Sequence, residues 1–368
     1  MRRPTIADVA KAANVSVSTV DRVLKRRHPV REETAELVQR AAEAVGYHLA
    51  QTVRRSGEQD RPVRTLGFLL QRRNEFYDTL GKLLQETTAA STTIRGRSML
   101  KFRDYQEEEV VAERLVQLGR TCDAVAVVAA DHPQLTEAID ILHEKGVPVF
   151  ALISELTAPN RAGYIGLDYW MVGKTAAWFL SNMCRTPGKI AIYVGNHRFQ
   201  SEIASEMSLR SYFREYARDF QLLESVVTLD EDDIAYKYTI NLLRETQDLV
   251  GIYVAGGGIN GVIRACREDP STSSRNLMII VMEGTQEAAK ALLTGEIKVI
   301  LAHPKKLLAD TLVEAMAKST MINQGAYYVH PRIQFDIRTQ ANWIPESELL
   351  KPYKPGLPWR RDIPRNPT

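Results

Sequence analysis

Apolar runs and amphipathic helical stretches alternate along most of the chain, from Thr65 to about residue 317. Runs such as TLGFLL and AVAVVA are apolar throughout, which predicts parallel strands covered by helices on both faces. They are more numerous than one open sheet usually holds, so we expect two lobes. Strands are predicted near 65–70, 97–102, 124–129, 147–152, 164–168, 189–195, 222–228, 251–256, 277–282 and 299–303. Helices are predicted near 77–90, 106–118, 133–145, 169–183, 203–218, 232–246, 259–267, 285–293 and 304–317.

The first 47 residues have a different pattern, which predicts three short helices. Thr5 followed by Asp8 is a capping-box-like start, and Ser16 is a favourable N-cap for the second helix. A third helix follows Pro29 and ends at Gly46. The turn between the first two helices is about three or four residues long, which is typical of a helix-turn-helix.

The second helix has an apolar face and a polar, basic face. Val20, Val23 and Leu24 form the apolar face, and the opposite face carries Val17, Ser18, Asp21, Arg22 and Lys25. Residues 1–64 hold 13 Lys and Arg against 8 Asp and Glu, a net charge of +5, while the rest of the chain holds 35 against 37. Clustered cations favour an anionic polymer such as DNA, with an ordinary solvated surface as the alternative.

Composition also bears on the compartment. No apolar run reaches the roughly 18 residues of a membrane span, and the N-terminus lacks the apolar segment of a signal peptide. Cys122, Cys184 and Cys266 lie far apart in apolar surroundings, as reduced thiols that fill a core would. We therefore expect a cytoplasmic protein without a metal site.

GGGING, from Gly256 to Gly261, follows a predicted strand and opens a helix, so it satisfies the G-x-G-x-x-G pattern of dinucleotide sites. Glu283, at the end of the next strand, would have to bind the ribose, but it lies 27 residues after Gly256 instead of about 20. We therefore predict no cofactor, and small residues that let a loop approach its neighbours. Without a G-x-S-x-G or H-E-x-x-H motif, the chain is not predicted to be an enzyme.

The stretch from Thr5 to Tyr47, TIADVAKAANVSVSTVDRVLKRRHPVREETAELVQRAAEAVGY, closely resembles the DNA-binding head of the LacI/GalR family of bacterial transcription regulators. The resemblance extends, more weakly, to residue 338. It implies an α/β chain with a small all-α helix-turn-helix domain and a two-lobed, periplasmic-binding-protein-like (type I) domain of parallel sheets. The expected divisions are a DNA-binding domain (1–48), a hinge (49–64), an effector-binding and dimerisation domain (65–340) and a Pro-rich tail (341–368).

The resemblance also implies a homodimer whose second helices enter the major groove of a near-palindromic operator. Val17, Ser18 and Arg22 are the expected base readers, since Arg can bind guanine in bidentate fashion and Val can contact a thymine methyl. Phosphate contacts are expected from Thr5, Ser16, Thr19 and Lys25.

Two positions depart from the family pattern. Asp21 stands where Ser is usual, and it either pairs with Lys25 or accepts a hydrogen bond from cytosine while opposing wrong sites. In the hinge, Ser56 replaces the leucine that wedges into the minor groove. We expect Arg54 and Arg55 to enter or flank that groove with weaker bending.

The ligand is expected between the lobes, at the carboxyl ends of the strands. Asn74, Phe76 and Tyr77 resemble the N-x-F-F loop of sugar-binding relatives, although a helix cap and two core aromatics would also explain them. Where sugar sensors often carry Asp-Arg, this chain has Ser154 and Glu155, so an ordinary neutral hexose or pentose is in doubt. The other candidate ligand-binding residues are Asp168, Asn260, Glu283 and His303.

These features together predict a transcriptional repressor controlled by a carbohydrate or sugar derivative. A solute-binding component of a transport system is the second candidate, because it would share the two-lobed body. An NAD-dependent enzyme is the third. Neither of these accounts for the basic helical head.

Overall fold

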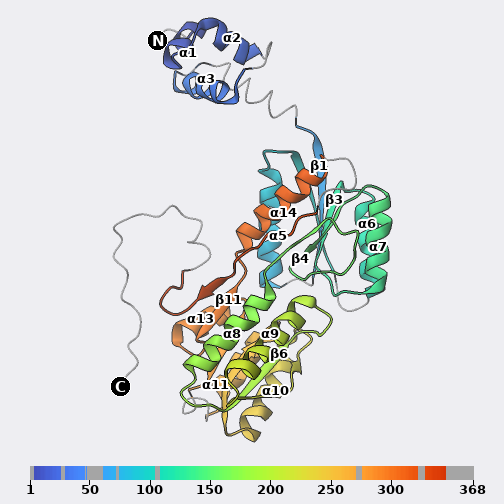
Figure 1. Cartoon of the computed structure of the whole chain (residues 1–368), viewed down its shortest axis with the longest axis vertical. Coiled ribbons are helices and arrows are strands. Elements are labelled where there is room, and N and C mark those ends of the chain that lie inside the picture. The colour runs from blue at the N-terminus through green and yellow to red at the C-terminus, as the bar shows by residue number, and fades with distance from the viewer. Residues whose placement is uncertain are drawn as a thin grey trace. The chain divides into compact units, whose positions relative to one another are not determined.

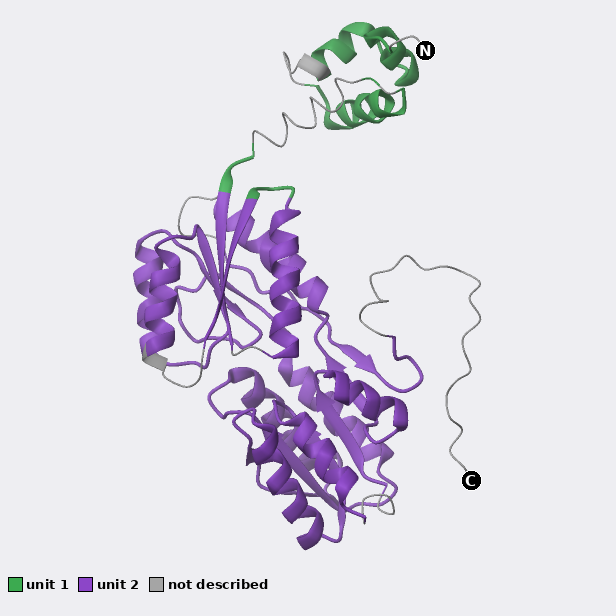
Figure 2. Cartoon of the chain, turned by 180° about the vertical axis from the view of Figure 1, so that it is seen from behind, with its two compact units in different colours: residues 1–63, 92–95 green, residues 64–91, 96–368 purple. Residues whose placement is uncertain are grey.

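The computed structural model describes residues 4–25, 30–45, 47, 61–71, 74–103, 108–270, 276–321 and 328–344. The chain falls into two compact units, drawn in different colours in Figure 2. One unit comprises residues 1–63 and 92–95, and the other comprises residues 64–91 and 96–368.

The N-terminal unit contains α1 (Ile6–Ala12), α2 (Val17–Lys25) and α3 (Glu32–Ala44). These helices enclose a small apolar core, to which α2 contributes Val20. The core residues are Val9, Ala10, Ala13, Val20, Val38, Ala41 and Ala42. The three predicted helices are thereby confirmed.

Both predicted helix caps of this unit are present. The Asp8 carboxylate accepts hydrogen bonds from the backbone N–H and the hydroxyl of Thr5, each at 2.7 Å. The backbone N–H of Thr19 donates to the Ser16 hydroxyl at 3.2 Å. These bonds satisfy donors that the first turn of a helix leaves without intrahelical partners.

The first lobe of the larger unit is built on a five-stranded sheet with the order β2-β1-β3-β4-β5. Helices α6 and α7 cover one face over an apolar cluster, and α5 packs with α14 on the other (Figure 1). The strands are β1 (Val63–Leu70), β2 (Arg95–Phe102), β3 (Ala124–Val127), β4 (Val149–Leu152) and β5 (Gly163–Ile165). The helices are α5 (Glu75–Ala89), α6 (Glu108–Gly119), α7 (Pro133–Glu144) and α14 (Lys305–Ser319).

The second lobe has a seven-stranded sheet with the path β12-β11-β10-β9-β6-β7, and β8 also pairs with β6. Helices α10, α11 and α13 enclose the core on one face, and α8 packs with α9 on the other (Figure 1). The strands are β6 (Lys189–Val194), β7 (Gln221–Leu222), β8 (Val226–Val227), β9 (Leu249–Val254), β10 (Met278–Met282), β11 (Val299–Ala302) and β12 (Asp336–Arg338). The helices are α8 (Tyr169–Met183), α9 (Gln200–Tyr216), α10 (Asp232–Glu245), α11 (Ile259–Glu268) and α13 (Gln286–Thr294).

The chain passes between the lobes more than once. It crosses after β5 into α8 and returns after β11 into α14, which packs against α5. A further crossing runs beside the first, with bridges between Gly163 and Val329 and between Leu167 and Ile333, and leads to β12. A change in the arrangement of the two lobes would therefore move the residues at these crossings.

The predicted alternation of strands and helices is confirmed, with two differences. The strand expected near 222–228 is divided into β7 and β8, each of two residues paired with β6. The short antiparallel strand β12 was not predicted, because an edge strand of three residues has no extended apolar run. None of the described helices is both long and apolar enough to cross a membrane.

Candidate functional site

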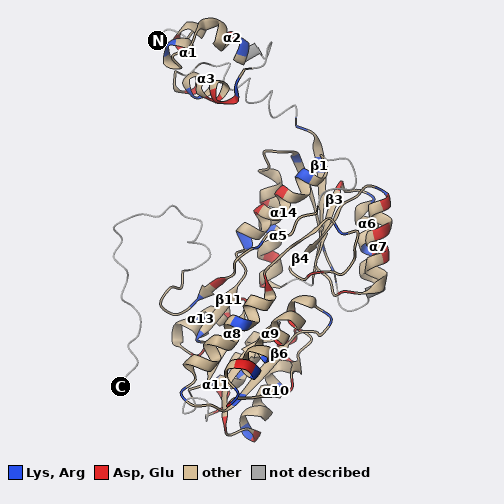
Figure 3. Ribbon diagram, in the orientation of Figure 1, with Lys and Arg blue, Asp and Glu red and all other residues tan. Residues whose placement is uncertain are grey.

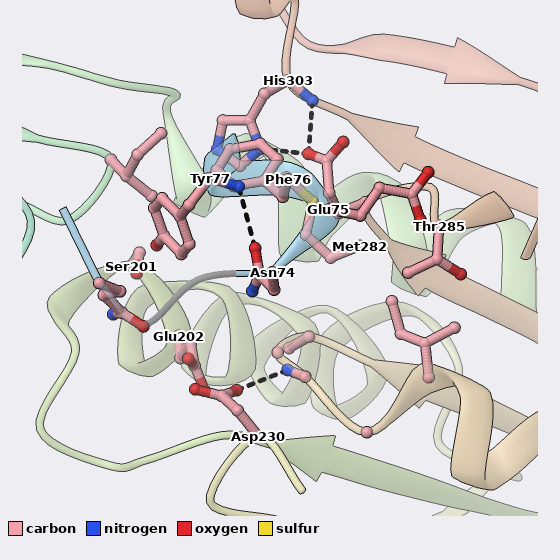
Figure 4. A pocket seen from close by; sticks show the side chains of 18 of the residues that line it. Asn74, Glu75, Phe76, Tyr77, Ser201, Glu202, Asp230, Met282, Thr285 and His303 are labelled. Atoms are coloured by element: carbon pink, nitrogen blue, oxygen red, sulfur yellow. Dashed lines mark hydrogen bonds and ion pairs between the residues drawn. The ribbon is translucent and has the colours of Figure 1, made fainter. Parts of the chain in front are cut away.

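A cavity of about 290 Å³ lies between the lobes. Its walls come from the start of α5 in the first lobe and from loops that follow β6, β8, β9 and β10 in the second. Figure 4 shows these side chains converging from both lobes. Six of the candidate ligand-binding residues line it: Asn74, Phe76, Tyr77, Asn260, Glu283 and His303.

The start of α5 places an amide and two rings on the first-lobe side. Asn74 is the N-cap, and its side-chain oxygen accepts from the backbone N–H of Tyr77 at 2.9 Å (Figure 4). Phe76 and Tyr77 meet edge to face with centroids 4.9 Å apart. Burial raises the pKa of Tyr77, so its hydroxyl stays protonated. The cap and the cavity lining are therefore both roles of this segment.

A buried polar network lies beside these rings, where the ring centroids of Phe76 and His303 are 5.2 Å apart. The Glu283 carboxylate lies 2.6 Å from Nδ1 of His303 and 2.9 Å from Nζ of Lys305. Burial alone would raise the pKa of Glu283, but Lys305 and His303 outweigh it and lower that pKa to about 2. Glu283 is therefore ionised at neutral pH.

The same network reaches the crossing between the lobes. The Tyr169 hydroxyl lies 2.7 Å from Nε2 of His303, and burial raises the pKa of Tyr169 well above its ordinary value. We assign a hydrogen to Nδ1 of His303, which donates it to the Glu283 carboxylate. Glu283 also has φ +82°, a left-handed conformation that costs a non-glycine residue free energy and is common at ligand sites.

Two further carboxyl groups line the second-lobe wall (Figure 4). Glu202 accepts from the backbone N–H of Gly195 at 2.5 Å, and Asp230 accepts from that of Gly257 at 2.7 Å. Burial and the nearby Asp230 raise the pKa of Glu202 to about 8. Near pH 7 Glu202 is therefore mostly protonated, and it can donate a hydrogen bond to a ligand oxygen.

The glycine-rich loop is explained by packing. A Cβ atom on Gly257 would lie 2.6 Å from a carboxylate oxygen of Asp230, and one on Gly256 would lie 2.9 Å from a carboxylate oxygen of Glu202. Gly258 has φ +93°, a conformation that favours glycine. These glycines let the loop approach the acidic pair, as the sequence analysis predicted.

Acidic side chains dominate the lining. No Lys or Arg is present among the cavity-lining residues that the structure describes, although Lys305 lies behind Glu283. The carboxyl groups of the lining are Glu75, Glu202, Asp230, Asp232 and Glu283. Arg72 and Arg73, which could attract an anionic ligand, lie outside the described residues.

The other three candidate ligand-binding residues, Ser154, Glu155 and Asp168, do not line the cavity. Ile153 has φ +66° and itself lines the cavity, while Ser154 is buried and its hydroxyl accepts from the backbone N–H of Ser201 at 3.3 Å. Glu155 forms an ion pair with Arg161 at 2.8 Å. Asp168 caps α8, and the next residue, Tyr169, contributes to the cavity instead.

The residues expected to contact DNA lie on the outer face of α2 and beside it. Val17 is 52% exposed, and Ser18 and Arg22 are also exposed, while Val20 is fully buried. Thr5 and Ser16 are exposed; Thr19 and Asp21 are partly so. The side chain of Lys25 and both Arg54 and Arg55 lie outside the described part of the chain, so the Asp21–Lys25 pair and the hinge stay predictions.

The fold and the cavity define a two-lobed binding domain joined to a helix-turn-helix. Residues 67–320 match the periplasmic binding protein domain, and residues 5–49 match the bacterial regulatory proteins of the lacI family. The chain belongs to the LacI/GalR family of bacterial regulators. No curated protein sequence matches it.

Solved structures show the same two-lobed fold. A solute-binding protein of an ABC transporter from Agrobacterium vitis, bound to α-D-tagatopyranose, has 14% identity and a TM-score of 0.68, covering 77% of this chain and 97% of that one. One from Burkholderia graminis, in complex with D-arabinose, has 16% identity and a TM-score of 0.66, covering 80% and 99%. One from Bacillus halodurans, with bound myo-inositol, has 14% identity and a TM-score of 0.66, covering 77% and 96%.

Proposed function

We propose that this protein is a transcriptional repressor that acts in the cytoplasm as a homodimer, and that a sugar-like ligand in the interlobe cavity sets its affinity for a near-palindromic operator. The observation that carries the proposal is that one chain holds both a helix-turn-helix with an exposed polar face and a two-lobed domain with a polar cavity. A solute-binding component of a transport system would use only the two-lobed domain.

The DNA-binding part of the proposal rests on the two faces of α2. Val20 anchors the helix in the core of the head, which leaves Val17, Ser18 and Arg22 exposed together. Such a face fits the major groove, where Arg discriminates guanine by two hydrogen bonds. Thr5, Ser16 and Thr19 would contact phosphates and fix the register, with Lys25 as a fourth candidate.

The cavity lining favours a ligand rich in hydroxyl groups. Phe76 offers a ring face or edge for stacking, and the side-chain amides of Asn74 and Asn260 offer donors and acceptors. Ionised Glu283 can accept from hydroxyls, and the mostly protonated Glu202 can donate. The described lining has five carboxyl groups and neither Lys nor Arg, so a neutral polyol or sugar derivative fits better than a sugar phosphate or sugar acid.

Regulation would follow from lobe closure. A ligand that contacts Phe76 from one lobe and Glu283 from the other binds one lobe arrangement better than another, and so shifts the population of arrangements. If only one arrangement spaces the two heads of a dimer for both half-sites, ligand affinity becomes coupled to operator affinity.

Thermal unfolding with a panel of neutral sugars, polyols, sugar acids and sugar phosphates tests the ligand. A ligand at 100 times its Kd stabilises the folded protein by about 2.7 kcal/mol. We expect a neutral member to raise the unfolding temperature, and Asn260→Ala to weaken that effect. A panel in which only sugar phosphates stabilise the protein would contradict the proposed ligand class.

A gel shift with DNA from upstream of the protein's own gene, with and without the stabilising compound, tests the coupling. We expect the compound to change operator affinity in the wild type. Arg22→Ala is the matched control, because it should bind the operator about 1 to 3 kcal/mol more weakly and keep the ligand-induced rise in unfolding temperature. An operator affinity that the bound ligand leaves unchanged would refute the regulatory role.

A further inference from the structure

Helix α8 exposes an apolar face that its own fold does not cover. Trp170 is 46% exposed, Met171 is 49% exposed and Trp178 is 50% exposed. With Lys174, which is also exposed, they form what we call the α8 tryptophan face. Two of the four tryptophans of the chain are on it. Clustered exposed aromatic side chains of this kind mark interaction sites more often than isolated ones do.

The opposite side of α8 is buried and packs against α9 and the sheet of the second lobe. Its buried residues include Val172, Ala176 and Leu180. Gly173 lets α9 approach so closely that a Cβ atom there would lie 1.9 Å from the carbonyl oxygen of Ser205. Since α8 is already anchored to α9 and to the sheet on this side, packing within the lobe does not require the tryptophan face.

The C-terminal segment has a matching periodicity in its sequence. Five of its prolines fall at every third position or at a multiple of three: Pro352, Pro355, Pro358, Pro364 and Pro367. A polyproline II helix has three residues per turn, so prolines at this spacing lie along one stripe. Proline stripes bind surfaces lined by aromatic side chains, with little loss of chain entropy.

We propose that the segment from Pro352 to Pro358, PYKPGLP, binds the α8 tryptophan face of its own chain. The contact would lie within one chain, and it depends neither on the ligand nor on the operator.

The length of chain beyond the described residues permits this contact. Trp343 packs against the core of the second lobe, the lobe that also contains α8. Pro352 is eight positions after Ile344, a reach of about 25 Å at ~3.1 Å per residue. This is enough to pass from one face of a sheet covered by helices to the other, since packed layers lie about 10 Å apart.

The spacing of the rings also fits. Trp170 and Trp178 are eight residues apart on α8, or about 12 Å along the helix axis. Successive in-phase prolines lie about 9 Å apart. A segment that crosses α8 at a slant can therefore place one proline on each indole. Lys174 is the only charged residue of α8, whose ribbon is largely tan in Figure 3, so the contact would be apolar and insensitive to salt.

Hydroxyl-radical footprinting of the full-length protein, read by mass spectrometry, tests this contact. We expect Trp170 and Trp178 to be oxidised roughly two- to threefold faster when Pro352, Pro355 and Pro358 are all replaced by Ala, because docking buries most of an indole that is otherwise half exposed. The rates should not depend on salt.

Pro345→Ala is the matched control, because Pro345 is out of phase with the stripe, and it should leave both rates unchanged. Met321, which is 52% exposed on the described surface, serves as the internal reference. Equal tryptophan oxidation in the wild type and the triple variant would overturn the proposal. So would protection that grows with protein concentration, since that would assign the surface to a second copy of the chain.

Discussion

Replacing Glu283 by Gln tests the electrostatic description of the cavity wall most sharply. The side chain of Glu283 is only 15% exposed, and its carboxylate lies 2.9 Å from Nζ of Lys305. The substitution keeps the shape of the side chain and removes its negative charge. We expect a large loss of folding stability at pH 7, together with a characteristic dependence on pH.

The size of the expected loss of stability follows from the pKa of Glu283. It falls from an ordinary value of 4.5 to about 2, and each pKa unit corresponds to 1.36 kcal/mol, so ionised Glu283 contributes about 3 kcal/mol to stability. Removing one partner of a buried pair typically costs about 3 to 5 kcal/mol. Because the folded-state pKa is depressed, this contribution is fully present above pH 4.5 and disappears as the pH falls towards 2. At pH 4 the wild type should already have lost about 0.8 kcal/mol of it.

Urea unfolding of the wild type and the variant at pH 7 and pH 4 measures both quantities. Glu202→Gln is the contrasting variant: since the pKa of Glu202 is raised to about 8, its carboxyl must take up a proton when the chain folds at pH 7. A neutral amide does not bear that cost, so stability at pH 7 should rise where Glu283→Gln lowers it. Adding Lys305→Met to Glu283→Gln should recover much of the loss. A Glu283→Gln variant as stable as the wild type at pH 7 would refute the assignment of an ionised Glu283.

Three more substitutions test other parts of the structure. Arg22→Ala should weaken operator binding by about 1 to 3 kcal/mol in a gel-shift titration, and binding equal to that of the wild type would exclude Arg22 as a base reader. Asp21→Ser should change which bases are selected from a randomised half-site if Asp21 contacts cytosine, whereas an unchanged preference would leave only the ion pair with Lys25. Gly173→Val should lower the urea midpoint substantially, because its side chain collides with the backbone at Ser205, and an unaltered midpoint would show that α8 and α9 can separate at little cost.

The sequence predicts most of this fold because its strands are short apolar runs separated by clear helical stretches. It also predicts which loops meet, since the carboxyl ends of parallel strands gather at one edge of a sheet. Asn260, Glu283 and His303 stand at strand ends where relatives place hydrogen-bonding residues, and Asn74 lies in a segment that resembles a loop of sugar-binding relatives. All four line the cavity.

Other parts of the site depend on details that periodicity does not encode. The left-handed backbone at Ile153 (φ +66°) is such a detail, because Ile153 lines the cavity while Ser154 and Glu155 do not. Glu202 was missed because it lies in the first turn of α9, where an acidic residue is ordinary. Tyr169 was missed because its neighbour Asp168 is the polar residue at the end of the strand.

The central claim is that α2 reads duplex DNA as one of a symmetric pair. Selection of double-stranded DNA from a random library by the purified protein, repeated at two salt concentrations, tests this claim most directly. We predict enrichment of one near-palindromic sequence whose affinity falls steeply with salt and is weaker in Arg22→Ala. Failure to enrich any sequence, or equal enrichment by Arg22→Ala, would contradict it.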